Sequence, residues 1–455
     1  MDVQRAGCNR QHRRYVESFI FGVLHTSNEV IPMLKKAILA FTSLLLFSVQ
    51  TVWAAGVEPI DVSGEINGAP FRIVIPANWN GTLLVYGHGY RDKADHPGEV
   101  DNRDADIAPN SALTNALLSQ GYGLSGSAYK DNGWAVEEGV QDLKNVVTHF
   151  RDNYGKPDRT IIWAFSMGTV IGFKSMEQFG GIYDGALCAC AVGAGATQSW
   201  DSAGDLALGY DVVFGMPSSW GSFGDVRDDI DFESEVQPKL IGEVVNPANF
   251  PKFEFLRLVT GTPGRGITPP AGFYPGWFFT DMFFATEARS ELERRARGPI
   301  VQNRDRDYDL TMGERIYLNS FGLPMAVIDG WLLAMNGQTY VEAPKYSRNY
   351  LRRNSNYPGR IQNPVLTMHT VVDPLVTVSQ EHEYAQTVEN VKRGDMLFQT
   401  YTNGNGHCAF TGPQLITAVN AINTWVRDGV KPTANAFPAA LGFVPDFVPP
   451  PMNQP

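Results

Sequence analysis

The stretch Thr160-Ile161-Ile162-Trp163-Ala164-Phe165-Ser166-Met167-Gly168-Thr169 decides the fold. Residues 160–165 are mostly bulky and apolar, which predicts a buried β-strand. Ser166 follows between Ala164 and Gly168, two small residues that allow the backbone to turn sharply into a helix and expose the serine hydroxyl. A serine in such a turn is either a nucleophile or the N-cap of the helix, and its surroundings in the fold separate the two alternatives.

Strands and helices alternate on both sides of this turn. A hairpin is predicted over residues 60–76, with its turn at Asn67-Gly68. We further expect strands at 82–86, 123–129, 160–165, 185–192, 365–369 and 396–401, and helices at 111–118, 136–154, 169–178, 379–391 and 413–426. This repeated order is typical of an α/β fold with a mostly parallel sheet flanked by helices.

The alternation is interrupted over residues 196–356, which are rich in aromatic residues, glycine and proline. Residues 55–195 and 357–430 are therefore expected to form one core, and residues 196–356 an inserted cap. Ligands of such sheets bind at the carboxyl ends of the strands, so the cap is expected to cover the binding site. Residues 431–455 are proline-rich and form either a surface-wrapping or a loose tail.

The composition excludes several classes of function. The chain has 455 residues, of which 43% are apolar and 19% are charged, so it can bury a large core. Its formal charge is −11, which repels nucleic-acid phosphates and argues against nucleic acid as a partner. The sequence shows no metal-ligand spacing, dinucleotide fingerprint or phosphate loop, and the acidic residues 225–231 lack the spacing of a calcium loop. No metal and no cofactor are therefore predicted.

A secretory signal peptide is predicted over residues 33–54. Met33-Leu34-Lys35-Lys36 precedes an apolar run at residues 37–49 and the small residues Ala54-Ala55, which is the pattern of a cleaved export signal. Residues 1–32 are either a leader without structure or a mis-assigned start. No other apolar run is long enough to span a membrane, so we expect a secreted or periplasmic protein without a membrane span.

His407 is the strongest candidate for a general base among the eight histidines. It follows the strand predicted at 396–401, in a loop whose residues 403–406 include two glycines and can reach over Ser166. A serine nucleophile needs such a base, and the base needs an acid that holds its tautomer. Asp373 lies 34 residues earlier, after the preceding strand. The chain order of serine, aspartate and histidine therefore predicts a catalytic triad, and the alternative for Asp373 is a helix cap.

Attack on a carbonyl group creates an oxyanion, which preorganised N–H groups stabilise. Met167 follows the serine directly and is expected to supply one N–H group. The strand predicted at 82–86 ends in Gly87-His88-Gly89-Tyr90, so the backbone of Gly89 or Tyr90 is expected to supply the other. His88 itself is expected to hold this loop in place.

Trp277, Phe278 and Phe279 belong to an aromatic segment of the predicted cap. They are candidates for an aromatic substrate wall. The alternative is that they form the hydrophobic core of the cap itself.

Four segments together resemble bacterial secreted proteins of the α/β-hydrolase fold, some of which are labelled prolyl-oligopeptidase-like. The segments are Gly87-His88-Gly89, Ala164 to Gly168, Pro358-Gly359-Arg360-Ile361 leading to Asp373-Pro374, and Gly406-His407-Cys408-Ala409-Phe410-Thr411. The resemblance covers residues 57–195 and 357–430, and it implies the fold and the triad but no substrate. Ala164 departs from the glycine that usually opens the serine turn, although it is still small.

The pair His407-Cys408 also resembles tannases and feruloyl esterases, in which cysteines next to the serine and the histidine form a disulfide. Phe165 precedes the serine in this chain, so the bridge is expected to join Cys408 to Cys190 or Cys188. Cys190 is favoured, because similar sequences carry a cysteine at that point of the strand. The alternative is that all three cysteines are buried thiols.

These features predict a secreted serine hydrolase that cleaves a small or polymeric carboxylic ester through an acyl-enzyme. The same triad also suits a peptidase or an acyltransferase. A non-catalytic binding protein on the same scaffold is the alternative from another class. The sequence leaves the oligomeric state open.

Overall fold

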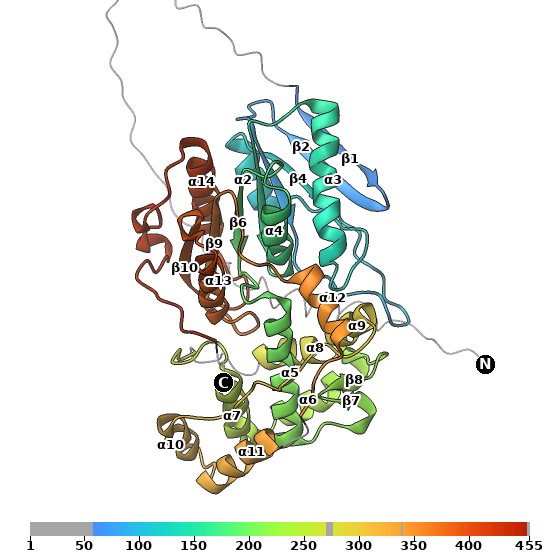
Figure 1. The fold of residues 1–455 in the computed structure, drawn as a ribbon, viewed down its shortest axis with the longest axis vertical. Helices are drawn as coiled ribbons and strands as arrows, with labels where there is room; N and C mark the ends of the chain where they lie inside the picture. The colour runs from blue at the N-terminus through green and yellow to red at the C-terminus, as the bar shows by residue number, and fades with distance from the viewer. Residues whose placement is uncertain (1–57, 270–275, 338–339, 453–455) are drawn as a thin grey trace, which may run out of the picture. The chain divides into compact units, whose positions relative to one another are not determined.

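An eight-stranded mixed sheet organises the chain (Figure 1). The computed structural model describes residues 58–269, 276–337 and 340–452. The strands are β1 Ile60–Ile66, β2 Ala69–Ile75, β3 Thr82–Gly87, β4 Gly123–Ser127, β5 Arg159–Phe165, β6 Gly185–Ala189, β9 Val365–Val372 and β10 Leu397–Asn405. Their order across the sheet is β1-β2-β4-β3-β5-β6-β9-β10. The β1–β2 and β2–β4 pairs are antiparallel, and the pairs from β4 to β10 are parallel.

Helices cover both faces of the sheet. They are α2 Ser111–Ser119, α3 Val136–Tyr154, α4 Met167–Gln178, α13 Ser379–Asn390 and α14 Gly412–Asp428. Helices α3, α4 and α13 pack on one face, and α2 and α14 pack on the other. Successive strand residues point to opposite faces of the sheet. Ile162 of β5 therefore joins the hydrophobic cluster on the side of α3, α4 and α13, whereas Ile161 and Trp163 join the cluster on the side of α2 and α14. Burial on both faces explains why the strand at the serine turn reads as a continuous apolar run.

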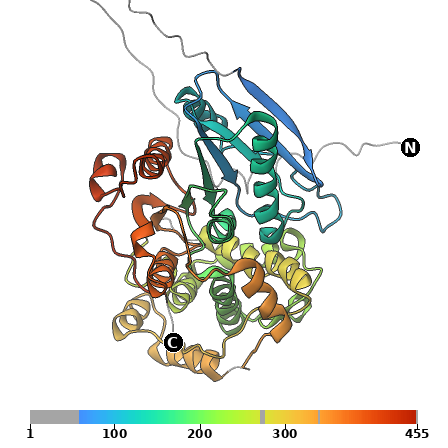
Figure 2. The same ribbon diagram turned by 45° about the horizontal axis from the view of Figure 1, so that its top comes forward.

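The segment between β6 and β9, for which a cap was predicted and which is called the cap below, is mainly helical (Figures 1 and 2). Its helices are α5 Gly195–Phe214, α6 Gln237–Val244, α7 Phe250–Thr260, α8 Gly276–Ala285, α9 Glu287–Ala296, α10 Met312–Ser320, α11 Met325–Gly337 and α12 Lys345–Ser355. A short hairpin of β7 Gly221–Ser222 and β8 Asp225–Val226 also belongs to it. The single-turn elements of the chain are η1 Ser218–Trp220, η2 Phe232–Val236, η3 Pro247–Asn249, η4 Gly394–Met396, η5 Ala434–Ala436 and η6 Ala439–Leu441.

The cap has a hydrophobic cluster of its own and is also anchored to the core. Tyr210 of α5, Phe253 of α7 and Phe278 of α8 pack together in the cap cluster. Leu292 of α9 and Leu351 of α12 instead join the cluster between the sheet and α3. The cap and the sheet therefore fall within a single compact unit.

The predicted strands and helices of the core are confirmed, and two strands end earlier than expected. Strand β4 ends at Ser127 and β6 ends at Ala189, although apolar residues continue beyond both. Tyr129 and Cys190 have φ angles of 58° and 49°. A left-handed backbone cannot continue a strand, so the chain turns at these residues.

The described part of the proline-rich tail packs on the core. Phe437 and Phe443 are buried against the face that α14 covers. The Val444 N–H donates to the Tyr401 carbonyl oxygen at 2.8 Å, so the tail also covers the edge strand β10. The predicted leader and signal peptide lie outside the described residues. Within the described ranges, no helix combines the length and the apolar character needed to cross a membrane.

Candidate active site

Ser166 occupies a sharp turn between β5 and α4. Its φ angle of 53° is left-handed, which is uncommon for a residue other than glycine. The turn fits because Gly168 brings α4 close to β3, where a Cβ atom at position 168 would lie 2.3 Å from the Gly87 carbonyl oxygen. Gly87 also pairs with Ala164 across the sheet. A methyl group at position 164 is therefore tolerated because its neighbour on β3 has no side chain.

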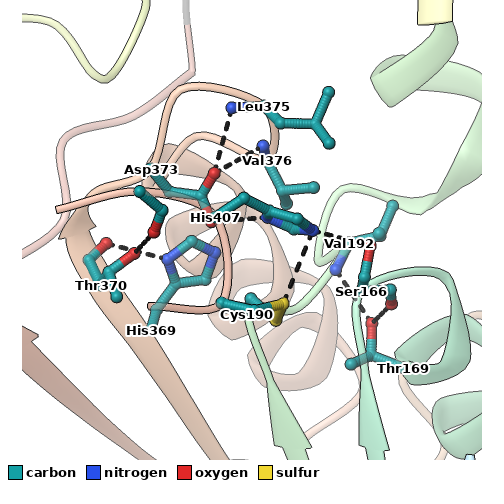
Figure 3. Close-up of a disulfide and its surroundings, with 12 residues drawn as sticks. Ser166, Thr169, Cys190, Val192, His369, Thr370, Asp373, Leu375, Val376 and His407 are labelled. Atoms are coloured by element: carbon teal, nitrogen blue, oxygen red, sulfur yellow. Dashed lines mark hydrogen bonds and ion pairs between the residues drawn. A yellow bond between two sulfur atoms is a disulfide. The ribbon is translucent and has the colours of Figure 1, made fainter. Parts of the chain in front are cut away.

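The structure brings Ser166, His407 and Asp373 into one hydrogen-bonded chain (Figure 3). The Ser166 Oγ lies 2.8 Å from His407 Nε2, and His407 Nδ1 lies 2.8 Å from Asp373 Oδ2. Asp373 is fully buried, and its Oδ1 accepts from the backbone N–H groups of Leu375 and Val376 at 3.0 and 2.9 Å. These two bonds hold the carboxylate in the orientation that receives His407.

The order of the sheet and the positions of these side chains decide the fold. Ser166 follows β5, Asp373 follows β9 and His407 follows β10, in a parallel sheet whose antiparallel pairs lie at the β1 edge. This is the α/β-hydrolase fold. The segment between β6 and β9 is inserted after β6, so both this segment and the histidine loop reach the serine from the carboxyl ends of the strands.

A disulfide joins Cys190 at the end of β6 to Cys408 in the histidine loop. Of the two pairings that the sequence left open, the structure has the one through Cys190. Cys188 is a free thiol in the core, and burial raises its pKa well above the usual range. The disulfide therefore ties the residue next to His407 to the end of β6 within the sheet.

The loop after β3 lies against the serine. A Cβ atom at Gly89 would lie 3.2 Å from the Ser166 Cβ, and Met167 and Tyr90 both line the cavity beside the serine. His88 is buried and stacks on the Tyr129 ring, with their centroids 3.9 Å apart. Burial lowers the pKa of His88 to about 3, so this imidazole is neutral. The placement of His88 fits a residue that holds the loop.

The cavity beside Ser166 lies between the strand ends and the cap. Its aromatic lining comes from Tyr90, Trp134, Trp200, Phe284 and Tyr308. Its polar lining includes Ser199, Ser202, Thr260, Asp205, Asp281 and Arg306. Met452 of the C-terminal tail also lines it, which no feature of the sequence indicated.

The aromatic segment Trp277–Phe279 packs inside the cap, whereas a substrate wall would line the cavity. Trp277 and Phe278 are 3% and 0% exposed and belong to the cap cluster, against which Phe279 also packs. None of the three is among the described residues that line the cavity, whereas Phe284, one turn and a half further along α8, is. The packing therefore favours the alternative in which this segment forms the core of the cap.

Asp281 also lines the cavity, and the sequence analysis did not predict it as a site residue. It lies on α8, is 9% exposed, and has no hydrogen-bond partner for its Oδ1 among the described residues. Burial, followed by the charge of Asp373, raises the pKa of Asp281 well above the usual range of an aspartate. The one signal in the sequence is a single acid within an otherwise aromatic and apolar helix.

Comparison with known proteins gives distant relatives. No family model matches the chain. An o-phthalyl amidase from Xanthobacter agilis is 23% identical over 412 residues, which cover 81% of this chain and 87% of the amidase.

Solved structures that resemble the chain include three fungal hydrolases. An esterase from Aspergillus oryzae is 12% identical, and the alignment covers 82% of this chain and 80% of the esterase with a TM-score of 0.43. A tannin acyl hydrolase from Aspergillus niger has 11% identity, with 82% and 79% covered and a TM-score of 0.40. Feruloyl esterase B from Aspergillus oryzae has 13% identity, with 82% and 80% covered and a TM-score of 0.38. At these scores the likeness is loose, and the strand order alone assigns the fold.

Proposed function

We propose that this protein is a serine hydrolase that cleaves carboxylic esters, with Ser166 as nucleophile, His407 as general base and Asp373 as the orienting acid. The observation that carries the proposal is the hydrogen-bonded chain from Ser166 Oγ through His407 to Asp373, at the wall of a cavity. A base within hydrogen-bond reach of the serine and a buried acid behind the base meet the geometric requirement for activating a hydroxyl group.

The reaction proceeds in two steps. His407 Nε2 takes the Ser166 proton while Oγ attacks the ester carbonyl, and the Met167 N–H with a backbone N–H of Gly89 or Tyr90 stabilises the oxyanion. The imidazolium then gives its proton to the leaving alcohol, and an acyl-enzyme remains. Water activated by His407 attacks that acyl group and releases the acid, which restores the serine.

Amide hydrolysis is the second candidate, and the amidase relative is the observation that favours it. An amide requires a proton on its leaving nitrogen, and His407 can supply that proton as it does for an alcohol. Peptide hydrolysis and transfer of the acyl group to an alcohol would require the same three residues. Export of the protein is also proposed, supported by the disulfide, because disulfides persist in oxidising compartments.

The test compares Ser166→Ala with the wild type on 4-nitrophenyl hexanoate and on the matching 4-nitroanilide. Ser166→Ala is expected to lower kcat by at least about a thousandfold without loss of thermal stability, because the nucleophile is removed. Ser202→Ala, which removes a second hydroxyl group from the same cavity, serves as the control. Full turnover by Ser166→Ala contradicts the proposed nucleophile. A higher kcat/KM for the anilide, or for an o-phthalyl amide, favours the amidase alternative.

Labelling with a fluorophosphonate separates an enzyme from a binding protein. An activated serine reacts with this probe, whereas an unactivated hydroxyl does not. We expect one label per chain, located on Ser166 and absent from Ser166→Ala. A wild-type protein without the label would support the non-catalytic alternative.

A further inference from the structure

Asp281 is a buried acid in the wall of the Ser166 cavity, and its Oδ1 has no hydrogen-bond partner among the described residues. The residue is about nine-tenths buried, and it lines the same cavity as the serine. Buried polar groups in proteins nearly always have a hydrogen-bond partner. A carboxyl group left without one at a ligand cavity therefore indicates that the ligand supplies the partner.

A second acid of the same cavity shows the contrast. Asp205 receives a hydrogen bond from the Tyr308 hydroxyl at 2.7 Å and lies 3.2 Å from the Arg306 guanidinium. The described residues provide no such cation for Asp281, since the charge that acts on it is the carboxylate of Asp373. Asp205 is satisfied by the protein, whereas Asp281 is available to a ligand.

The protonation state decides what Asp281 offers. Burial and the neighbouring negative charge both disfavour its ionised form. A protonated carboxyl group has one O–H donor in addition to its acceptor oxygen. Within an enclosed cavity this donor is suited to a carbonyl, carboxyl or ether oxygen on the ligand.

We infer that Asp281 donates a hydrogen bond to an oxygen on the acyl group of the substrate, other than the oxygen of the carbonyl group whose carbon Ser166 attacks. This inference rests on the proposed function, because it concerns the substrate of the same serine. The acyl group stays on Ser166 through both steps, so a fixed donor in the cavity acts on it throughout the reaction. The preferred substrates are then oxygen-bearing acyl esters or amides rather than plain alkyl ones.

The experiment compares 4-nitrophenyl heptanoate with its 4-oxo, 5-oxo and 6-oxo derivatives, which differ only in one keto oxygen along the chain. The wild type is expected to prefer at least one keto ester by about tenfold in kcat/KM, the ratio that one unpaired buried donor produces. Asp281→Leu is expected to lose this preference. Asp281→Asn is expected to retain part of it, because its amide N–H group also donates.

Asp307→Asn provides the matched control, because Asp307 lines the same cavity but is exposed. It is expected to keep the wild-type preference. A wild type without preference for any keto ester overturns the inference, and so does an Asp281→Leu variant that retains the preference. Because Asp281→Asn is nearly isosteric, it also keeps the test decisive if Asp281→Leu does not fold.

A binding measurement separates failure of this inference from failure of the proposed function. Titration of Ser166→Ala with heptanamide and its three keto derivatives reports recognition without turnover. Tighter binding of a keto amide, lost when Asp281→Leu is added, supports the inference even if no ester is hydrolysed. Ester turnover without any such preference supports the proposed function and overturns the inference.

Discussion

Replacing Cys190 and Cys408 together by alanine is expected to lower both the stability and the activity of this protein. Cys408 directly follows His407, and its partner Cys190 lies at the end of β6 in the middle of the sheet. The disulfide therefore limits the motion of the loop that carries the proposed base. Without it, His407 is held near Ser166 by its own loop and by its hydrogen bonds with Asp373 and Ser166.

The size of the stability change follows from the separation of the two cysteines. They are 218 residues apart, so the bond closes a large loop and reduces the conformational entropy of the unfolded chain. The chain-entropy relation gives about 18 cal/mol/K for such a loop, or about 5 kcal/mol at 25 °C. Since measured values commonly fall below this limit, we expect a loss of about 3 to 5 kcal/mol. A loop that misplaces His407 should also lower kcat by about tenfold or more.

Urea unfolding and ester kinetics on the same samples test this prediction. The double alanine variant should match wild-type protein treated with dithiothreitol, since both lack the same bond. Cys188→Ala is the control, because it removes a buried cysteine of β6 and leaves the disulfide intact. The reasoning is refuted if the double variant has the stability of Cys188→Ala and the kcat of the wild type.

Three further predictions concern the serine turn and the cap. Gly168→Ala should cost about 3 kcal/mol and reduce activity, because its Cβ would lie 2.3 Å from a backbone oxygen of β3. Burial and the nearby charge of Asp92 raise the pKa of Glu287 to about 9, whereas the unfolded chain releases this proton near 4.5, so wild-type stability should fall as pH rises between these values. Glu287→Gln should therefore add about 3 to 5 kcal/mol at pH 8, because about 1.4 kcal/mol is gained for each pH unit above 4.5. Arg348→Met should cost about 3 to 5 kcal/mol, because it leaves the buried carboxylate of Asp201 without its cation.

Each of these predictions has a control in urea or thermal unfolding. Gly181→Ala adds a methyl group where nothing lies within 4 Å, so it should be silent. Glu287→Gln should have no effect at pH 4, where Glu287 is mostly protonated in both states. Arg304→Met breaks an exposed ion pair and should cost less than about 1 kcal/mol. Equal losses in Arg304→Met and Arg348→Met, or a uniform effect of Glu287→Gln across pH, would contradict the stated causes.

The order of the core could be predicted from the sequence because it depends on short-range patterns. Residues 160–165 are a short apolar run that is buried as a β-strand. The small residues around Ser166 permit the sharp turn from this strand into a helix. Parallel strands end at the same edge of a sheet, so the residues after each strand converge there. Together with the two glycines in the loop before His407, this rule predicted that Asp373 and His407 lie near Ser166, although they are more than 200 residues away in the chain.

The cap was beyond such rules because its helices are packed by contacts distant in the chain. Helix α8 is apolar nearly all round, so its sequence shows no preferred face. Only the arrangement of α5, α7 and α9 around it turns Trp277 and Phe278 into the cap core and Phe284 and Asp281 toward the cavity.

By itself, then, the sequence determined the alternation of strands and helices, the serine turn and the order of the three polar residues, since each depends on local pattern and on strand direction. The tertiary structure decided which cysteine closes the bridge, which aromatic side chains line the cavity, and that Asp281 lines the Ser166 cavity with an Oδ1 that has no partner among the described residues. These depend on distances between segments far apart in the chain, which packing sets and local pattern does not encode.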